Sequence, residues 1–266
     1  KTAASRIKTY VGGASILNEL TDVSMDITNF ADGLLIQPNS DGSAPTTGTL
    51  STATENIGIG HGTFSALTSG DYNTAVGSRA GTALTTGSEN QLFGKGAGDG
   101  ITTGQYNHIF GMNAGSTFDT ESHNVAFGLS ALGSTIAGGE YNTAIGNVAG
   151  DAITSGDANT CVGYQAGGAI TEGSENVFVG RTAGDSCTTG SNNILLGVGI
   201  NPSSNSGDHC LGLGNNFGVA ANDFSFGKAS NVVTNDFDAD ANWSRSSDVR
   251  KKREIYDQGL GLDFIN

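Results

Sequence analysis

An asparagine recurs every 17 residues through most of this chain, and a glycine follows each of these asparagines four positions later. The spacing is longer only once, by one residue, between Asn124 and Asn142. The asparagines, called anchors below, are Asn56, Asn73, Asn90, Asn107, Asn124, Asn142, Asn159, Asn176 and Asn193, and their glycines are Gly60, Gly77, Gly94, Gly111, Gly128, Gly146, Gly163, Gly180 and Gly197. A short period repeated over so much of a chain is typical of an array in which each unit packs against its neighbours.

Apolar residues keep the same period; a residue n places after an anchor is called position +n. Position +3 is apolar in every unit, position +7 is small or aliphatic in nearly every unit, and position +11 is mostly apolar. Position +2 is also apolar in several units, as Ala75, Leu92, Ile109, Cys161, Phe178 and Leu195. Only 36% of the residues are hydrophobic, a polarity that could indicate disorder. The regular phasing argues against disorder and favours thin stacked coils.

The unit is too short to hold two packed helices, and each of its glycines would cost a helix about 1 kcal/mol. Short β-branched runs between glycine turns instead favour two short strands per coil. We therefore predict an all-β fold, a parallel β-roll or β-solenoid of about eleven 17-residue coils over residues 52–230. Its last two units, at residues 210–214 and 223–227, are degenerate. At about 4.8 Å per coil the array would be roughly 48 Å long.

Stacked coils would place the anchors above one another, so that each side chain can bond to the backbone of the next coil. Glycine suits the corners because it adopts positive φ without penalty. We therefore predict as structural anchors Asn73, Gly77, Asn90, Gly94, Asn107, Gly111, Asn142, Gly146, Asn159, Gly163, Asn176 and Gly180.

Positions +2 and +3 are adjacent in a strand and must point to opposite faces. One face can fill the coil, but the other needs a partner. A parallel homotrimer, in which two identical chains cover that face, is our hypothesis for the assembly.

Charge and cysteine content exclude several functions. The net charge is −14, and only four basic residues stand against 22 acidic ones between Tyr10 and Ser244. This field would repel nucleic acid and anionic membrane surfaces, and no apolar run is long enough for membrane insertion. The three cysteines, Cys161, Cys187 and Cys210, form no Cys-x-x-Cys pair, so we interpret the phased ones as small core residues.

No motif of a common enzyme occurs. The chain lacks a Gly-x-Ser-x-Gly elbow and a phosphate-binding Gly-x-x-x-x-Gly-Lys-Ser/Thr loop, and its four histidines lie in separate units. We therefore expect neither a metal nor a cofactor, with calcium at an acidic corner the weaker alternative. Tyr72, Tyr106 and Tyr141 each precede an anchor. They could stack on sugars, but packing on their neighbours is the favoured interpretation.

Units such as Asn-Thr-Ala-Ile-Gly at residues 142–146 and Asn-Thr-Ala-Val-Gly at residues 73–77 resemble the head repeats of trimeric autotransporter adhesins. They are still more similar to the repeat arrays of bacteriophage tail fibres. The resemblance implies a left-handed parallel β-roll built from three chains.

A second resemblance lies near the C-terminal end. Residues 247–252 read Ser-Asp-Val-Arg-Lys-Lys, which resembles the opening motif of the endosialidase-type intramolecular chaperone domain. Residues 261–266 are similar to the early helix of that domain. The resemblance implies that Ser247 is a nucleophile, that Lys252 is its general base, and that Asp248 begins a released piece. Alternatively, Ser247 or Asp248 only caps a helix with a solvated basic start.

The expected organisation is a non-repetitive segment at 1–51, the array at 52–230, a junction at 231–246 and the start of a helical chaperone domain at 247–266. The resemblances imply an extracellular structural component of a virion tail fibre that mediates host attachment. Its partners would be other tail proteins and a host surface glycan or protein. We expect no enzyme activity beyond a single-turnover cleavage at Ser247. A trimeric bacterial surface adhesin is the alternative, and a polysaccharide-degrading tailspike is less favoured.

Overall fold

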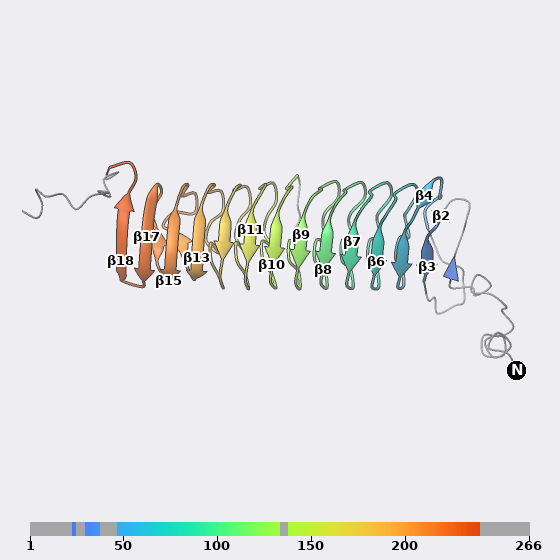
Figure 1. Cartoon of the computed structure of the whole chain (residues 1–266), viewed down its shortest axis with the longest axis horizontal. Coiled ribbons are helices and arrows are strands. Elements are labelled where there is room, and N and C mark those ends of the chain that lie inside the picture. Colours follow the sequence, from blue (N-terminus) through green and yellow to red (C-terminus); the bar gives the residue numbers. More distant parts are fainter. Residues whose placement is uncertain (1–22, 25–29, 38–46, 134–137, 240–266) are drawn as a thin grey trace, which may run out of the picture.

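The computed structural model describes residues 23–24, 30–37, 47–133 and 138–239. These residues form an all-β rod without a helix, a parallel β-solenoid of about ten turns (Figure 1). The predicted β class, parallel stacking and 17-residue coil are thereby confirmed. The helical chaperone start expected at 247–266 lies outside the described residues.

Each regular coil contributes one three-residue strand, at positions +1 to +3. These strands are β5 Ile57–Ile59, β6 Thr74–Val76, β7 Gln91–Phe93, β8 His108–Phe110, β9 Val125–Phe127, β10 Thr143–Ile145, β11 Thr160–Val162 and β12 Val177–Val179. Neighbouring strands pair in parallel so that equivalent positions are partners. Because the period is constant, the same residue type stacks on itself from coil to coil.

The expectation of two strands per coil was wrong for these regular coils. After the strand, three residues in five adopt positive φ, as at Gly77 (138°), Arg79 (63°) and Gly81 (58°). Left-handed residues this close together turn the chain repeatedly, so the second side of the coil cannot be extended. Its backbone still bonds to the next coil, for example from Gly81 N–H to the Ala97 carbonyl at 3.1 Å.

Within the described residues, second strands appear only near the two ends of the rod. There β2 Phe30–Ala31 pairs with β4 Ala53–Thr54, and β14 Asn201–Pro202 pairs with β16 Gly218–Val219. The main sheet has fourteen strands. It also contains β13 Ile194–Val198, β15 Leu211–Asn215 and β17 Asp223–Lys228.

Both ends of the main sheet finish with an antiparallel strand. At one end β1 Val23–Ser24 pairs with β3 Leu34–Ile36, which in turn lies parallel to β5. β3 therefore extends the sheet of the array. At the other end β18 Asn231–Asp236 folds back on β17. These reversed strands stop the parallel stacking (Figure 1).

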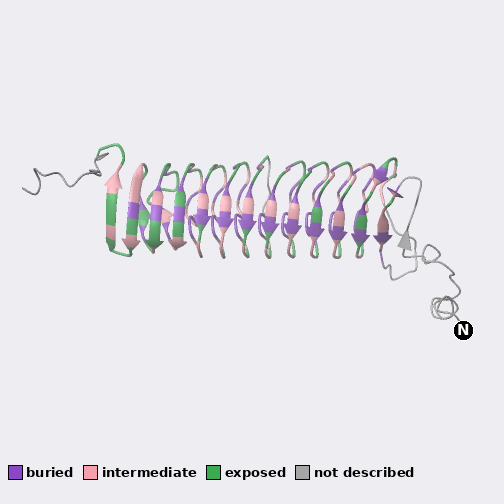
Figure 2. Ribbon diagram, in the orientation of Figure 1, coloured by how far each residue is buried: buried purple, intermediate pink, exposed green. Residues whose placement is uncertain are grey.

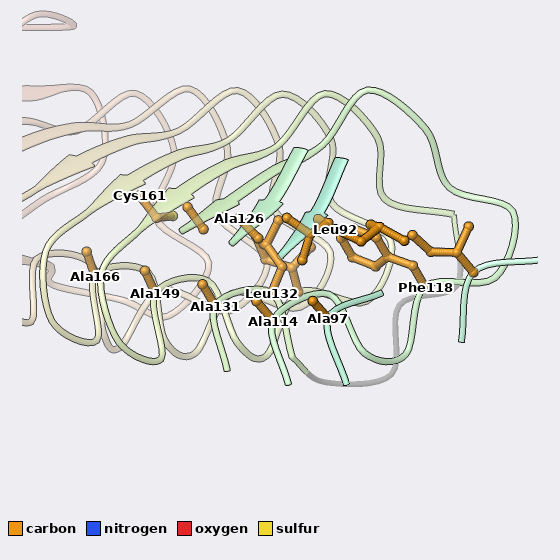
Figure 3. Close-up of a cluster of buried hydrophobic side chains, with 14 of the residues drawn as sticks. Leu92, Ala97, Ala114, Phe118, Ala126, Ala131, Leu132, Ala149, Cys161 and Ala166 are labelled. Atoms are coloured by element: carbon orange, nitrogen blue, oxygen red, sulfur yellow. The ribbon is translucent and has the colours of Figure 1, made fainter. Parts of the chain in front are cut away.

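The interior is a narrow column of apolar side chains. Each strand buries its middle residue, at position +2, and leaves positions +1 and +3 outside (Figure 2). Positions +7 and +11 fill the rest of the column, as with Ala97, Ala114, Ala131 and Phe118 (Figure 3). Alanine dominates position +7 because so small a coil leaves little room on that side.

Candidate functional site

The anchor asparagines form a buried ladder along the rod. Asn176 is typical: its Nδ2 donates to Oδ1 of Asn159 at 2.9 Å and to the Gly190 carbonyl at 2.9 Å. Its own Oδ1 accepts the N–H of Asn193 at 3.0 Å. All nine anchors are buried. An amide whose donors and acceptor are all used costs little to bury, so these residues act structurally.

The anchor glycines turn the chain where no side chain fits. Gly77, Gly94, Gly111, Gly146, Gly163 and Gly180 all have φ between 134° and 144°. A Cβ at each of them would collide with the carbonyl of the glycine in the next coil. Glycine is therefore required both by the backbone angle and by the close approach of neighbouring coils.

A second ladder runs beside the first, and the sequence analysis missed it. Two places before the anchor in most coils, and two places before Cys210 in the coil after Asn193, a Ser or Asp oxygen accepts an N–H of the preceding coil. The acceptors are Asp71, Ser88, Ser122, Asp157, Ser174, Ser191 and Asp208, at 2.7–3.1 Å. The recurrence of Asp and Ser at this place was the available signal, because these residues favour such turns.

On the outward face of β5–β13 and β15, position +3 is apolar throughout, whereas position +1 holds Thr, Gln or His in several coils. Position +3 points outward, and Phe93, Phe110 and Phe127 stack there with ring centroids 4.8 and 5.6 Å apart. Phe127 is 56% exposed. In β5–β13 and β15, neither outward position holds an Asp, Glu, Lys or Arg. Such a stripe on an acidic chain is a candidate interaction surface.

The residues that directly precede the anchors form a row at one corner of the rod, called the corner row below. Their backbone is in the left-handed conformation. Glu55, Tyr72, Glu89, Tyr106 and His123 have φ between 54° and 62°. Tyr106 and Tyr141 each stack on His123 between them, with centroids 4.9 Å apart. Packing on a neighbour, the favoured interpretation from sequence, therefore holds for two of the three tyrosines.

Tyr72 is not part of this ring stack. It lies instead at one side of a pocket of about 400 Å³ that is also lined by Glu89, Gln91, Tyr106 and His108. The charge of Glu55 raises the pKa of Tyr72. Desolvation, a hydrogen bond with Glu55 and the charges of Asp71 and Glu89 raise it as well. The pocket therefore lies in a negative field.

The three cysteines are free and buried. Burial and the charge of Cys187 raise the pKa of Cys161 to about 12. Burial is also the main cause that raises the pKa of Cys187 to about 11 and that of Cys210 to about 12. All three thiols are thus protonated at neutral pH, which makes them poor nucleophiles.

Within the described ranges, no group of three or more His, Cys, Asp or Glu residues is placed to hold a metal ion. The same ranges contain no helix that could cross a membrane. Ser247, Asp248 and Lys252, the expected cleavage residues, lie outside the described part of the chain.

No protein-family model matches this chain, and neither a curated protein nor a solved structure is significantly similar to it.

Proposed function

We propose that this chain is the shaft of a bacteriophage tail fibre, a homotrimeric extracellular rod that mediates host attachment. The observation that carries the proposal is the uncharged apolar stripe that runs along the outer face of the solenoid sheet.

The shaft of a fibre must be stiff, so that it does not bend along its length. Here backbone hydrogen bonds join each coil to the next on all sides of the rod. The buried ladder of anchors and the ladder of Ser and Asp acceptors add side-chain bonds between the same coils. A structure bonded at every step along its axis favours a mechanical role over a catalytic one.

The apolar stripe supports assembly with two identical chains. Ile59, Phe127, Ile145 and Leu196 are 38–56% exposed, and all belong to position +3. A net charge of −14 makes copies of this chain repel one another wherever charged faces meet. The uncharged face is where repulsion is weakest and apolar burial gains most.

Light scattering on the purified chain tests the assembly. We expect a particle of three times the chain mass of 26.9 kDa. A stable particle of one chain mass would overturn the trimer and the fibre model with it.

The biological setting needs a separate experiment. Antibodies against residues 52–230 should label the tail of virions, and the purified array should reduce virion adsorption to host cells. Labelling of the bacterial surface instead would identify the alternative, a trimeric adhesin. Turnover of a capsule or lipopolysaccharide by the chain would identify a tailspike.

We also propose that residues 247–266 begin an intramolecular chaperone domain, on the resemblance of their sequence. If the peptide bond between Ser247 and Asp248 is hydrolysed, Lys252 takes the proton of the Ser247 hydroxyl, and one water supplies the new carboxyl of Ser247 and the proton of the new Asp248 amine. The mature chain then ends at Ser247, and mass spectrometry of the purified chain reads this directly. An intact bond between Ser247 and Asp248 would rule out processing.

A further inference from the structure

The corner row contains a stack of rings with one gap. Tyr106, His123 and Tyr141 come from consecutive coils and stack at 4.9 Å. Tyr72 also belongs to this row, but Glu89 occupies the coil between Tyr72 and Tyr106. The pocket of about 400 Å³ lies at this place, between the two tyrosines. We call it the corner slot.

The width of the corner slot is set by the solenoid. Tyr72 and Tyr106 stand two coils apart, which at about 4.8 Å per layer separates their Cα atoms by about 9.6 Å. A group held midway between two rings at this spacing would lie about 4.8 Å from each, within the range of about 6 Å for cation–π attraction. A methylated ammonium suits this distance, because its methyl carbons then contact each ring at about 3.5–4 Å.

The carboxylates around the slot favour a cationic ligand over an anionic one. Glu89 lines it, and Glu55 and Asp71 stand close enough that their charges act on Tyr72. Arg79, one coil away, is paired with Asp99 at 3.1 Å. An anionic ligand would be repelled here, whereas a cation gains from both the carboxylates and the ring faces.

The walls of the slot are held before any ligand arrives. Three cross-coil hydrogen bonds fix its corner residues: Tyr72 N–H to Thr54 at 3.0 Å, Glu89 N–H to Asp71 at 2.9 Å, and Tyr106 N–H to Ser88 at 3.2 Å. Binding therefore need not order the backbone, which reduces its entropic cost.

We propose that the corner slot binds a methylated organic ammonium group of the kind carried by choline. Tyr72 and Tyr106 would enclose the ammonium, Glu89 would balance its charge, and Gln91 and His108 would contact whatever group the ammonium is attached to. A monomer or an adhesin with the same coils would also contain this site, and Gln91 and His108 place it at the border of the outward face of β7 and β8.

Titration calorimetry of the assembled chain with choline tests the site, with 3,3-dimethyl-1-butanol as the uncharged ligand of equal shape. We expect saturable binding of choline and at least about tenfold weaker binding of the alcohol. Equal affinity for the two ligands, or no binding of choline, would overturn the proposal. Binding of a neutral monosaccharide in preference to choline would overturn it as well.

Two further arms identify the source of the ammonium. Phosphocholine in solution and vesicles of phosphatidylcholine are offered to the same protein. Co-sedimentation with the vesicles would assign the slot to a lipid surface, and binding of the soluble ligands alone would assign it to a free or polymer-bound head group. Either result supports an ammonium site.

Substitutions of slot residues test whether choline binds in the corner slot. Tyr72→Ala and Glu89→Gln should each weaken choline binding at least about fivefold. Tyr141→Ala is the matched control, since Tyr141 occupies the same corner position two coils beyond Tyr106 and outside the pocket. Unchanged affinity in both slot variants, with circular dichroism showing the native fold, would refute the assignment.

Discussion

At the scale of single residues, this fold depends on polar groups that are buried without being left unsatisfied. Asn90 is a typical anchor: its N–H and Nδ2 donate to Oδ1 of Asn73, its Nδ2 also donates to the Gly104 carbonyl, and its own Oδ1 accepts from the next anchor. The cost of burying an amide is thus offset within the ladder. Removing one amide affects three coils, because its partners above and below lose their bonds together.

Asn176→Ala should lower the free energy of unfolding by about 2–4 kcal/mol, since it leaves the Gly190 carbonyl and the Asn193 N–H without their partner. Chemical denaturation followed by circular dichroism measures this loss. Glu175→Ala is the control, because Glu175 is the exposed neighbour in the same corner and should cost under about 0.5 kcal/mol. Equal losses in the two variants would show that the ladder contributes little.

The residues of the corner slot also have an unusual backbone conformation. Non-glycine residues with positive φ are uncommon, yet the corner row uses them in consecutive coils. Asn, Asp and Gly would be the cheaper choices in such backbone. Tyrosine and glutamate at these corners therefore favour a role for their side chains, which the choline titration examines.

At the scale of elements, a coil consists of one strand followed by a chain of turns. Three-residue strands are too short to be stable alone. Here each is stabilised by pairing in register with a strand on either side. One irregular coil shows how the pattern tolerates change. There Leu132 replaces the usual glycine and fills the column beside Ala126, while Glu121 accepts the N–H groups of Asp119 and Gly138.

Gly163→Ala should destabilise the rod by about 2–4 kcal/mol, because the residue has φ of 137° and its Cβ would lie 2.6 Å from the Gly180 carbonyl oxygen. Gly138→Ala serves as the comparison. Gly138 also has positive φ, at 110°, but a Cβ there meets nothing within 4 Å. The two melting temperatures, measured side by side, should fall much further for Gly163→Ala; a similar fall in both would contradict close coil packing.

At the scale of the whole molecule, charge and apolar surface are separated. Along the regular coils, acidic residues lie at corners and turns, whereas the outward positions of β5–β13 and β15 carry no Asp, Glu, Lys or Arg. Repulsion between the charged sides keeps rods apart, and the uncharged stripe leaves one face for specific association. We infer that this separation directs the rods into a trimer rather than into sheets or aggregates.

Phe127→Glu should convert the proposed trimer to single chains, because it places a charge in the middle of the stripe. Phe127 is 56% exposed in one chain, so the coil itself should fold normally. Leu129→Glu is the matched control: Leu129 is 40% exposed but lies past the glycine corner, off the strand. Light scattering distinguishes the outcomes, and loss of the trimer in both variants would place the interface elsewhere.

The sequence alone determined the β class, the parallel stacking and the length of the coil. A fixed period forces equivalent residues into register, so the anchors and their glycines had to form columns along the rod. These features follow from local spacing and need no knowledge of distant contacts.

Only the tertiary structure decided which face turns inward, that a coil has one strand rather than two, and where the corner slot lies. The inward face depends on how each coil closes, because positions +2 and +3 are both apolar and either could fill the column. The slot depends on side chains from three coils. Its existence follows from a glutamate, Glu89, that stands where the neighbouring coils place rings. A single unit of the repeat contains neither piece of information, because both arise only when several coils are stacked.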